Sequence, residues 1–538
     1  MSGVKSFLRK FDIENFEKIL SQKVFNIDLS VFFVAIAIGI YTITFSYLTI
    51  MKYYGFRTYA WDLGIFTQSL WTAANGQGFF YHTPELFVNP SGIFFGVHFS
   101  PILFLVLPFY WIMPTPETLL VLQSFILALA AVPIYKLAKE NAGGRIVGLI
   151  FAVAYLMFPA VHFVNWYDFH VQVFLPLFFT CIIYYVMKGN WPKYFLFVFL
   201  ALMCEEHVAL ITFFVGIYIA WRYRVSILST IRREKTAEKK LLIPFITMII
   251  SIVWYWFTIW QRNTFFPTNP EAIEEFLGSV NFSILGARDP LEIPLLIVLR
   301  PWNAVQALAY DGHIKLLYVA LLFGPLAFFS FKAPSALLPA IPWFGMAFVS
   351  QTLCHHMLGH QYEAYVVSFI FVTAIFALKK NYLKKSELKH ITGSVKKIVV
   401  FSLIFFVVAS PLCPVVRFLF PDYTSIYIGE HERLLSEVVN IVPPNASIIT
   451  QNNLFTHFSH RVDAYVVPDR FLGSKIRDIA VDFVNVTLDK VEYVLVDNKT
   501  NPVATAFVLS LLETKPQFTL ISSKDNSTIL LYKRIPEV

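Results

Sequence analysis

Apolar stretches that are long enough to cross a lipid bilayer recur along most of this 538-residue chain. One crossing by an α-helix needs about 20 mostly apolar residues. Counting the stretches predicts eleven membrane spans. The two short ones at 193–205 and 207–221 could instead form one bent pair that does not fully cross. The predicted spans lie near residues 28–50, 117–136, 144–163, 172–187, 193–205, 207–221, 241–260, 315–331, 335–350, 363–378 and 397–416.

The basic segments 136–145, 222–240 and 379–397 set the orientation, because short cytoplasmic loops carry an excess of Lys and Arg. With the N-terminus inside the cell, all three segments are cytoplasmic and the polar C-terminal part is extracytoplasmic. The stretch 99–113, FSPILFLVLPFYWIM, has only fifteen residues and contains two prolines. It therefore predicts a dipping or re-entrant element within a first external loop, 51–116.

From about residue 425 the pattern changes to short apolar runs of strand type, such as VEYVLVD and TILLYKR, that alternate with helical stretches. This alternation predicts a small α/β domain over residues 421–538. The chain is thereby divided into a cytoplasmic segment (1–27), a transmembrane domain (28–420) and an extracytoplasmic α/β domain. The α/β domain has no glycine-rich phosphate loop and no nucleophile elbow, so we interpret it as a structural or acceptor-recognition cap.

The composition agrees with a multi-pass protein of the cell membrane: 57% of the residues are apolar, 14% are charged and the mean hydropathy is +0.61. A net charge of +8 could indicate a nucleic-acid partner. The basic residues gather between the apolar spans, however, as expected beside anionic lipid, and we exclude nucleic acid. The four cysteines lie within or beside apolar segments, so neither a disulfide framework nor a zinc site is predicted.

Ionisable side chains at the outer membrane face are functional candidates, because they are costly to hold there. Asp62 follows the first span in the stretch RTYAWDLGIFTQSLW. Leu63, Phe66 and Leu70 repeat along one face and predict a helix that lies in the membrane interface. Asp62 could simply cap this helix by accepting hydrogen bonds from its first turn.

Two further segments place carboxylates beside histidines at the same face. NWYDFH carries Asp168 and His170, which suit a divalent cation or a proton relay but could also be solvated loop residues. MCEEH carries Glu205 and Glu206, and two adjacent carboxylates between apolar runs are expensive unless they line a polar cavity. His98, just before the dipping element, could do no more than bind a backbone carbonyl.

The segments WDLGIFTQSLW, HFSPILFLVLPFYWIM, YDFHVQVFLP and CEEHVAL resemble the prokaryotic membrane-protein family catalogued as domain of unknown function 2079, which is grouped with the GT-C glycosyltransferases. The resemblance spans the chain and includes VPPNASIITQNNLFTHFSHR in the tail. It departs at Cys204, where the family usually has the lysine of a Lys-Glu-Asp triplet. The resemblance implies a GT-C-like, α-helical polytopic fold in which Asp62 is the catalytic base and Asp168 helps to bind the donor or a metal.

A sugar on a polyprenyl phosphate already has a good leaving group, so an inverting transferase needs a base for the acceptor hydroxyl and cations for the departing phosphate. Asp62 is the predicted base, with a pKa raised by burial. Asp168 and His170 could hold Mg²⁺ or Mn²⁺, and the acceptor could be a glycan, a lipid or a protein. The residues predicted to bind the lipid-linked donor or its phosphate are Arg57, His98, His170, Glu205, Glu206, Arg300, His355, His360 and Tyr362.

Alternatives to this function stay open. The segment HHMLGHQY, which holds His355 and His360, could equally be an aromatic and polar belt at the membrane surface. A transporter or lipid flippase would use Glu205 and Glu206 as an ion or proton relay. A non-catalytic GT-C-like scaffold would use the external domain only to bind partners. The enzyme is favoured because the carboxylates gather at one face and no inverted repeat is visible.

Overall fold

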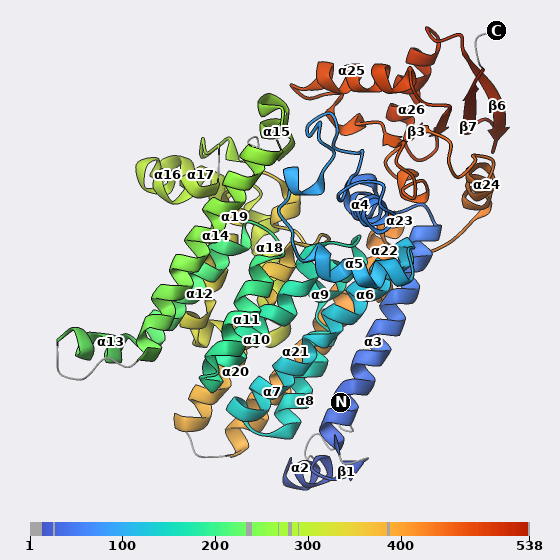
Figure 1. The fold of residues 1–538 in the computed structure, drawn as a ribbon. Coiled ribbons are helices and arrows are strands. Elements are labelled where there is room, and N and C mark those ends of the chain that lie inside the picture. Colours follow the sequence, from blue (N-terminus) through green and yellow to red (C-terminus); the bar gives the residue numbers. More distant parts are fainter. Residues whose placement is uncertain are drawn as a thin grey trace.

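The computed structural model describes residues 13–24, 27–232, 239–266, 268–277, 282–288, 290–384 and 388–535. It shows a bundle of helices that carries the C-terminal domain at one end (Figure 1). Parts of the predicted cytoplasmic segment 1–27 and of the basic segments 222–240 and 379–397 lie outside the described residues.

The bundle is built from the apolar stretches, and each of the predicted spans overlaps a helix of the bundle. The bundle helices are α3 (Leu29–Tyr54), α6 (Pro116–Leu129), α7 (Ala131–Ala142), α8 (Arg145–Leu156), α9 (Pro159–Trp166), α10 (Leu175–Lys188), α11 (Trp191–Leu202), α12 (Val208–Arg222), α14 (Ile243–Phe265), α18 (Gly312–Phe323), α19 (Ile341–Val349), α20 (Val367–Lys384) and α21 (Leu388–Ala409). Smaller helices are α2 (Ile13–Leu20), α4 (Ile65–Ala74), α5 (Leu103–Ile112), α13 (Arg224–Ile231), α15 (Pro270–Leu277), α16 (Ile293–Leu299), α17 (Pro301–Ala309), α22 (Pro414–Leu419) and α23 (Pro421–Thr424).

Length and hydropathy give a smaller number of clear spans than the sequence predicts. Within the described residues, five helices are long and apolar enough to cross a membrane, or up to eight if each bent pair is one span. One such pair is α8 with α9, bent by 42°. The helices α11, α19 and α20 are apolar but shorter. The number eleven therefore stays a prediction.

The predicted cytoplasmic connections lie together in space. The connection between α7 and α8, helix α13, the end of α20 and the start of α21 all lie at the end of the bundle opposite the C-terminal domain (Figure 1). The N-terminal helix α2 lies at this end too. The basic segments thus mark one end of the bundle and the C-terminal domain marks the other.

The segment after α3 differs from the prediction of a helix in the membrane interface. Leu63, Phe66 and Leu70 are at most 3% exposed and pack into the core of the bundle. Helix α4 is therefore held inside the protein, because its apolar face has a protein surface to cover. Helix α5, in the stretch predicted to dip, has only ten residues and ends in the exposed Trp111 and Ile112.

The C-terminal domain contains a five-stranded sheet in the order β4-β3-β5-β7-β6. Strands β3, β4 and β5 are parallel, whereas β7 runs antiparallel to both β5 and β6. Every residue of β5 is buried, as expected for a central strand that is covered on both faces. The bounds are β3 (Ile448–Thr450), β4 (Ala464–Val466), β5 (Tyr493–Asp497), β6 (Phe518–Lys524), β7 (Ile529–Arg534), α24 (Glu430–Val439), α25 (Arg477–Leu488) and α26 (Pro502–Leu512), and a separate short pair near the N-terminus is β1 (Lys23–Val24) with β2 (Ile27–Asp28).

The domain packs directly on the segment that follows α3. The backbone N–H of Ala60 donates to Oδ1 of Asn452 at 2.8 Å, and the hydroxyls of Thr58 and Thr456 are 2.9 Å apart. Gly64 lies so close to Phe455 that a Cβ atom there would come within 2.7 Å of the ring. A glycine at position 64 is thus required by the close approach of the two parts.

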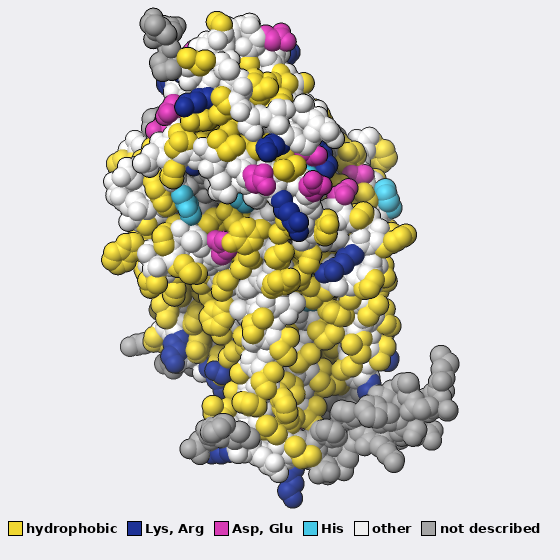
Figure 2. Space-filling view, turned by 90° about the vertical axis from the view of Figure 1, so that its right-hand side faces the viewer, with side chains coloured by type: hydrophobic (Ala, Val, Ile, Leu, Met, Phe, Trp, Pro, Cys, Tyr) yellow, Lys and Arg dark blue, Asp and Glu magenta, His cyan; other side chains and the backbone are white. Residues whose placement is uncertain are grey.

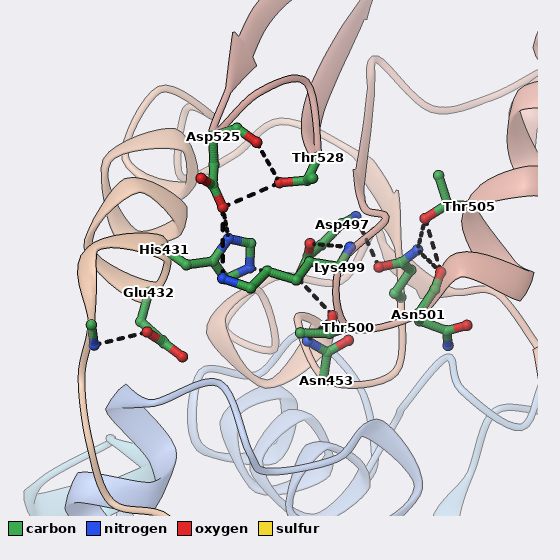
Figure 3. A network of polar contacts seen from close by, with 12 residues as sticks. His431, Glu432, Asn453, Asp497, Lys499, Thr500, Asn501, Thr505, Asp525 and Thr528 are labelled. Carbon is green, nitrogen blue, oxygen red and sulfur yellow. Dashed lines mark hydrogen bonds and ion pairs between the residues drawn. The ribbon is translucent and has the colours of Figure 1, made fainter. Parts of the chain in front are cut away.

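A polar network closes the C-terminal domain around His431 on α24 (Figure 3). Nδ1 of His431 is 2.6 Å from the carboxylate of Asp525, in the β6–β7 turn, and Nε2 is 3.1 Å from Asp497 at the end of β5. Asp497 is fully buried and also accepts from the hydroxyl of Thr500. His431 therefore ties a helix, a central strand and an edge turn together.

We expect His431→Leu to loosen this region, because the buried carboxylate of Asp497 loses one of its donors. The loss of such a bond costs roughly 1–3 kcal/mol. Amide hydrogen exchange should become faster in α24 and in the β6–β7 turn. Lys499→Gln is the matched control, since its ion pair with Asp525 spans 3.8 Å and the lysine is 57% exposed. Equal rates of amide exchange in both variants would contradict this structural role of His431.

Candidate functional site

Asp62 lies in a π-helical turn, Ala60–Gly64, that connects the end of α3 to α4. Such turns are rare and occur frequently at functional sites. Oδ2 of Asp62 accepts from the hydroxyl of Tyr167 at 3.0 Å, and Oδ1 is 3.2 Å from Nε2 of His170. The side chain of Asp62 is 18% exposed. Asp62 forms no cap of α4, so the capping alternative does not describe this residue.

Asp168 lies in the extended connection after α9 and is almost fully buried. Its Oδ1 accepts from Nζ of Lys52 at 3.0 Å, and its Oδ2 accepts from the backbone N–H of Tyr59 at 2.7 Å. Lys52 is in the last turn of α3 and is itself only 5% exposed. Asp168 therefore holds the end of α3 and the backbone of Tyr59, three residues before Asp62.

His170 joins the two aspartates. Its Nδ1 is 3.0 Å from the backbone carbonyl oxygen of Asp168, and its Nε2 faces Asp62. A carbonyl oxygen can only accept, so Nδ1 carries a proton. A second proton must then lie between Nε2 and the Asp62 carboxylate for that contact to be favourable. The pair is arranged to share one proton.

The pKa values of the two aspartates are shifted in opposite directions from their ordinary value. Burial would raise the pKa of Asp62, but the hydrogen bond and charge of His170 outweigh it, and the pKa lies below its ordinary value. The sequence-based expectation of a raised pKa at Asp62 is therefore wrong for this conformation. Burial, together with the charge of Asp62, raises the pKa of Asp168 in spite of Lys52.

The residues suggested for Mg²⁺ or Mn²⁺ do not form a suitable donor set. The carboxylate of Asp168 is occupied by the cation of Lys52, and His170 directs its nitrogens to Asp62 and to a backbone carbonyl. In the part of the chain that the structure describes, no group of three or more His, Cys, Asp or Glu side chains is arranged to hold a metal ion.

A second group of buried ionisable residues surrounds Glu205 and Glu206. Glu205 accepts from Nε2 of Gln172 at 2.9 Å and from the hydroxyl of Tyr365. Nδ1 of His98 is 3.7 Å from Glu206 and 3.9 Å from Glu205, which are ion-pair distances. Because Gln172 follows His170 by two residues, one short segment contacts both groups.

The ion pair of His98 with Glu206 and Glu205 predicts that the stability of the fold depends on pH. Burial alone would lower the pKa of His98, but Glu206 and Glu205 raise it to about 9, from 6.5. Burial would raise the pKa of Glu206, but His98 lowers it to about 2, from 4.5. A raised histidine pKa stabilises the fold below pH 6.5, and a lowered glutamate pKa does so above pH 4.5. The contribution is complete between these values and is lost as the pH rises through 9.

We therefore expect the difference in melting temperature between wild type and His98→Gln to be largest near pH 6 and to shrink by pH 9.5. Thermal unfolding in detergent at the two pH values measures it. His313→Gln, at an exposed histidine, is the control and should show no such trend. A difference that is equal at both pH values would contradict the ion pair.

Three other predicted donor-binding residues form a chain of ring contacts that reaches this region, since the ring centroids of His355 and Tyr362 are 5.3 Å apart and those of Tyr362 and His360 are 6.2 Å apart. The ring of His360 lies 4.9 Å from that of Tyr167, beside Asp62, whereas His355 contacts Ser350 at 2.8 Å. Tyr362 stacks on Trp343. The buried carboxylate of Glu363, next in the chain, has no hydrogen-bond partner among the described residues.

The two predicted phosphate-binding arginines have structural partners. Arg57 pairs with Glu432 at 3.0 Å and donates to the carbonyl of Tyr427. Arg300 packs against Gly286 and donates to the carbonyl of Leu285, on the α16–α17 side of the molecule (Figure 1). Among the described residues, neither guanidinium forms a hydrogen bond or an ion pair with Asp62, Asp168 or His170.

One known protein family matches most of the chain. The model of the family described as predicted membrane protein (DUF2079) matches residues 52–520. The chain belongs to this family. The matched range begins at Lys52 and includes Asp62, Asp168 and both glutamates. No curated protein matches the chain.

Among solved structures, the chain is similar to the archaeal oligosaccharyltransferase AglB from Archaeoglobus fulgidus, in complex with an inhibitory peptide and a dolichol-phosphate. The identity is 12% and the TM-score is 0.35. The alignment covers 94% of this chain and 74% of that chain.

Several residues of the site lie outside the sequence motifs that indicate the other site residues. Lys52 lies outside WDLG and YDFH, although a lone lysine near the end of an apolar span is itself a signal. Tyr167, directly before Asp168, is not among the residues that the sequence predicts for the site, although its hydroxyl donates to Asp62. Arg470, in the domain interpreted as a cap, lies 4.9 Å above the ring of Trp61. No local pattern pointed to it, since it reaches the site only through the fold.

Proposed function

We propose that this chain is a membrane glycosyltransferase that takes a sugar from a polyprenyl-phosphate-linked donor, with Asp62 as the base for an acceptor hydroxyl. The observation that carries the proposal is the oriented carboxylate of Asp62, partly exposed and held by His170 and Tyr167. The family's grouping with the GT-C glycosyltransferases supports the same reaction class and a GT-C-like arrangement of about eleven spans.

The reaction would proceed by direct displacement. The acceptor hydroxyl transfers its proton to Asp62 while its oxygen bonds to the anomeric carbon of the sugar. The bond from this carbon to the phosphate oxygen breaks, and its electron pair leaves with the lipid phosphate. Attack opposite the leaving group inverts the anomeric configuration. His170 and Tyr167 would position the Asp62 carboxylate, and Lys52 would hold the loop through Asp168.

The location of the site follows from the positive-inside rule. We propose that the bundle end with the basic connections is cytoplasmic and that the C-terminal domain is extracytoplasmic, because Lys and Arg are concentrated in cytoplasmic loops. The acceptor would then be a glycan, lipid or protein outside the cell. The C-terminal domain, which packs on the loop of Asp62, is suited to contribute to acceptor recognition.

A deletion strain tests the function. We expect mass spectrometry to show the loss of one surface glycan and accumulation of its lipid-linked sugar, with both restored by the wild-type gene. Unchanged glycans and unchanged lipid-linked sugars would refute the proposal. Proton-coupled flux in vesicles reconstituted with the protein, lost on Glu205→Gln, would instead support the transporter alternative.

A further inference from the structure

A hollow of about 760 Å³ opens on the flank of the molecule, where the last turns of α3 meet the segment from α22 to α24. Met51, Ile426 and Ile428 contribute its apolar lining, and Arg417 and Arg433 contribute its charge. This flank faces the viewer in Figure 2, where Lys, Arg, Asp and Glu side chains gather above a broad apolar band. The hollow therefore combines an apolar wall with two guanidinium groups.

The two arginines are not neutralised by the lining. None of the described residues that line the hollow is an Asp or a Glu. Arg417 donates Nε to the carbonyl of Pro411, which leaves its terminal nitrogens available. Within the described part of the chain, no ion pair is formed by Arg417 or Arg433. Two cations that face one hollow without a counter-charge favour an anionic ligand.

The surroundings place the hollow at the edge of a membrane. Phe418 is 85% exposed, Leu419 60% and Phe420 57%, all between the end of α21 and the C-terminal domain. Tyr427, which lines the hollow, is 74% exposed. Adjacent large apolar side chains with this exposure indicate contact with lipid, and aromatic residues favour the headgroup level.

The hollow is separate from the group around Asp62. Met51 lines the hollow, whereas the next residue, Lys52, turns inward to Asp168. Tyr423 lies between them, since its backbone carbonyl accepts from Trp166, two residues before Asp168. A ligand in the hollow would thus contact the outer wall of the candidate site and not the carboxylates themselves.

We propose that this hollow binds the phosphate headgroup of an anionic membrane phospholipid. Arg417 and Arg433 would bind the phosphate, since a guanidinium matches phosphate oxygens and is weakly hydrated. The lipid chains would lie along Phe418 and Leu419. The site does not depend on the proposed glycosyl transfer, and it would anchor the junction of bundle and C-terminal domain at the membrane surface.

Native mass spectrometry of the full-length protein in detergent, titrated with dioleoyl phosphatidylglycerol, tests this site. We expect one lipid to bind more tightly than the rest, and more tightly than dioleoyl phosphatidylcholine. Arg433→Gln and Arg417→Gln should each weaken it about fivefold, a rough value for one basic residue at an anionic surface. Arg433→Lys should retain most of the affinity. Higher salt should weaken binding.

Arg477→Gln is the matched control, because Arg477 is exposed in the C-terminal domain and does not line the hollow. Arg433 is exposed as well, so its variants are expected to fold, which an unchanged melting temperature verifies. Equal phosphatidylglycerol binding by Arg433→Gln, Arg417→Gln and Arg477→Gln would overturn the proposal. Inorganic phosphate binding as tightly as dioleoyl phosphatidylglycerol would overturn it too, since the lipid chains would then contribute nothing.

Discussion

Asp62→Asn is expected to slow sugar transfer by about 10²–10⁴-fold while leaving the fold intact. Asparagine keeps the size of the side chain and can still accept from Tyr167, so the π-helical turn should be retained. It cannot take a proton from an acceptor hydroxyl. General-base catalysis contributes about 10²–10⁴-fold to a rate, and we expect a loss of this order. The measurement is the amount of glycan restored when the variant is expressed in the deletion strain.

Asp422→Asn provides a matched control, since this aspartate is exposed at the same end of the bundle and outside the group around Asp62. It should restore glycans like wild type. The melting temperatures of both purified variants show whether a loss is chemical or structural. Full complementation by Asp62→Asn would remove this residue from catalysis and leave the proposed reaction without a base.

Lys52→Met is expected to destabilise the protein strongly, because it leaves the Asp168 carboxylate buried without its cation. Breaking a buried ion pair by removing one partner costs about 3–5 kcal/mol. The double variant Lys52→Met with Asp168→Asn should recover most of this loss, because no uncompensated charge remains and Asn can still accept from Tyr59. Thermal unfolding in detergent compares the three proteins.

The decisive result for the ion pair between Lys52 and Asp168 is the order of the variants in thermal stability. Lys188→Met is the control, since Lys188 forms a surface ion pair with Glu140 at 2.9 Å and is 46% exposed. Pairs of this kind contribute about 0–1 kcal/mol. If the double variant were no more stable than Lys52→Met, the cost would come from lost packing, and the ion pair would not be the cause.

The sequence predicts the helical bundle, the small C-terminal sheet and the membrane class, because span length and strand alternation are local signals. It does not predict the partners of the site. Asp62 and His170 are more than a hundred residues apart, and only the fold brings them to 3.2 Å. For the same reason the sequence predicts a raised pKa for Asp62, because it indicates burial of the carboxylate and does not reveal the contact with His170 that lowers the pKa.

The apolar spacing of Leu63, Phe66 and Leu70 led to an error of another kind. A helix with one apolar face needs an apolar surface, but the pattern does not say whether lipid or protein supplies it. Here the bundle supplies it, and the C-terminal domain covers the turn before α4 through Asn452 and Phe455.

The contact of the C-terminal domain with the turn before α4 matters for any shortened form of the protein. A chain shortened at residue 420 would keep every helix of the bundle and every carboxylate of the site, yet Ala60 would lose its hydrogen bond to Asn452 and Gly64 its packing partner. We therefore expect removal of the C-terminal domain to relax the loop that carries Asp62, although no residue of that loop is deleted, and a separately added domain would have to form the same two contacts again to restore it.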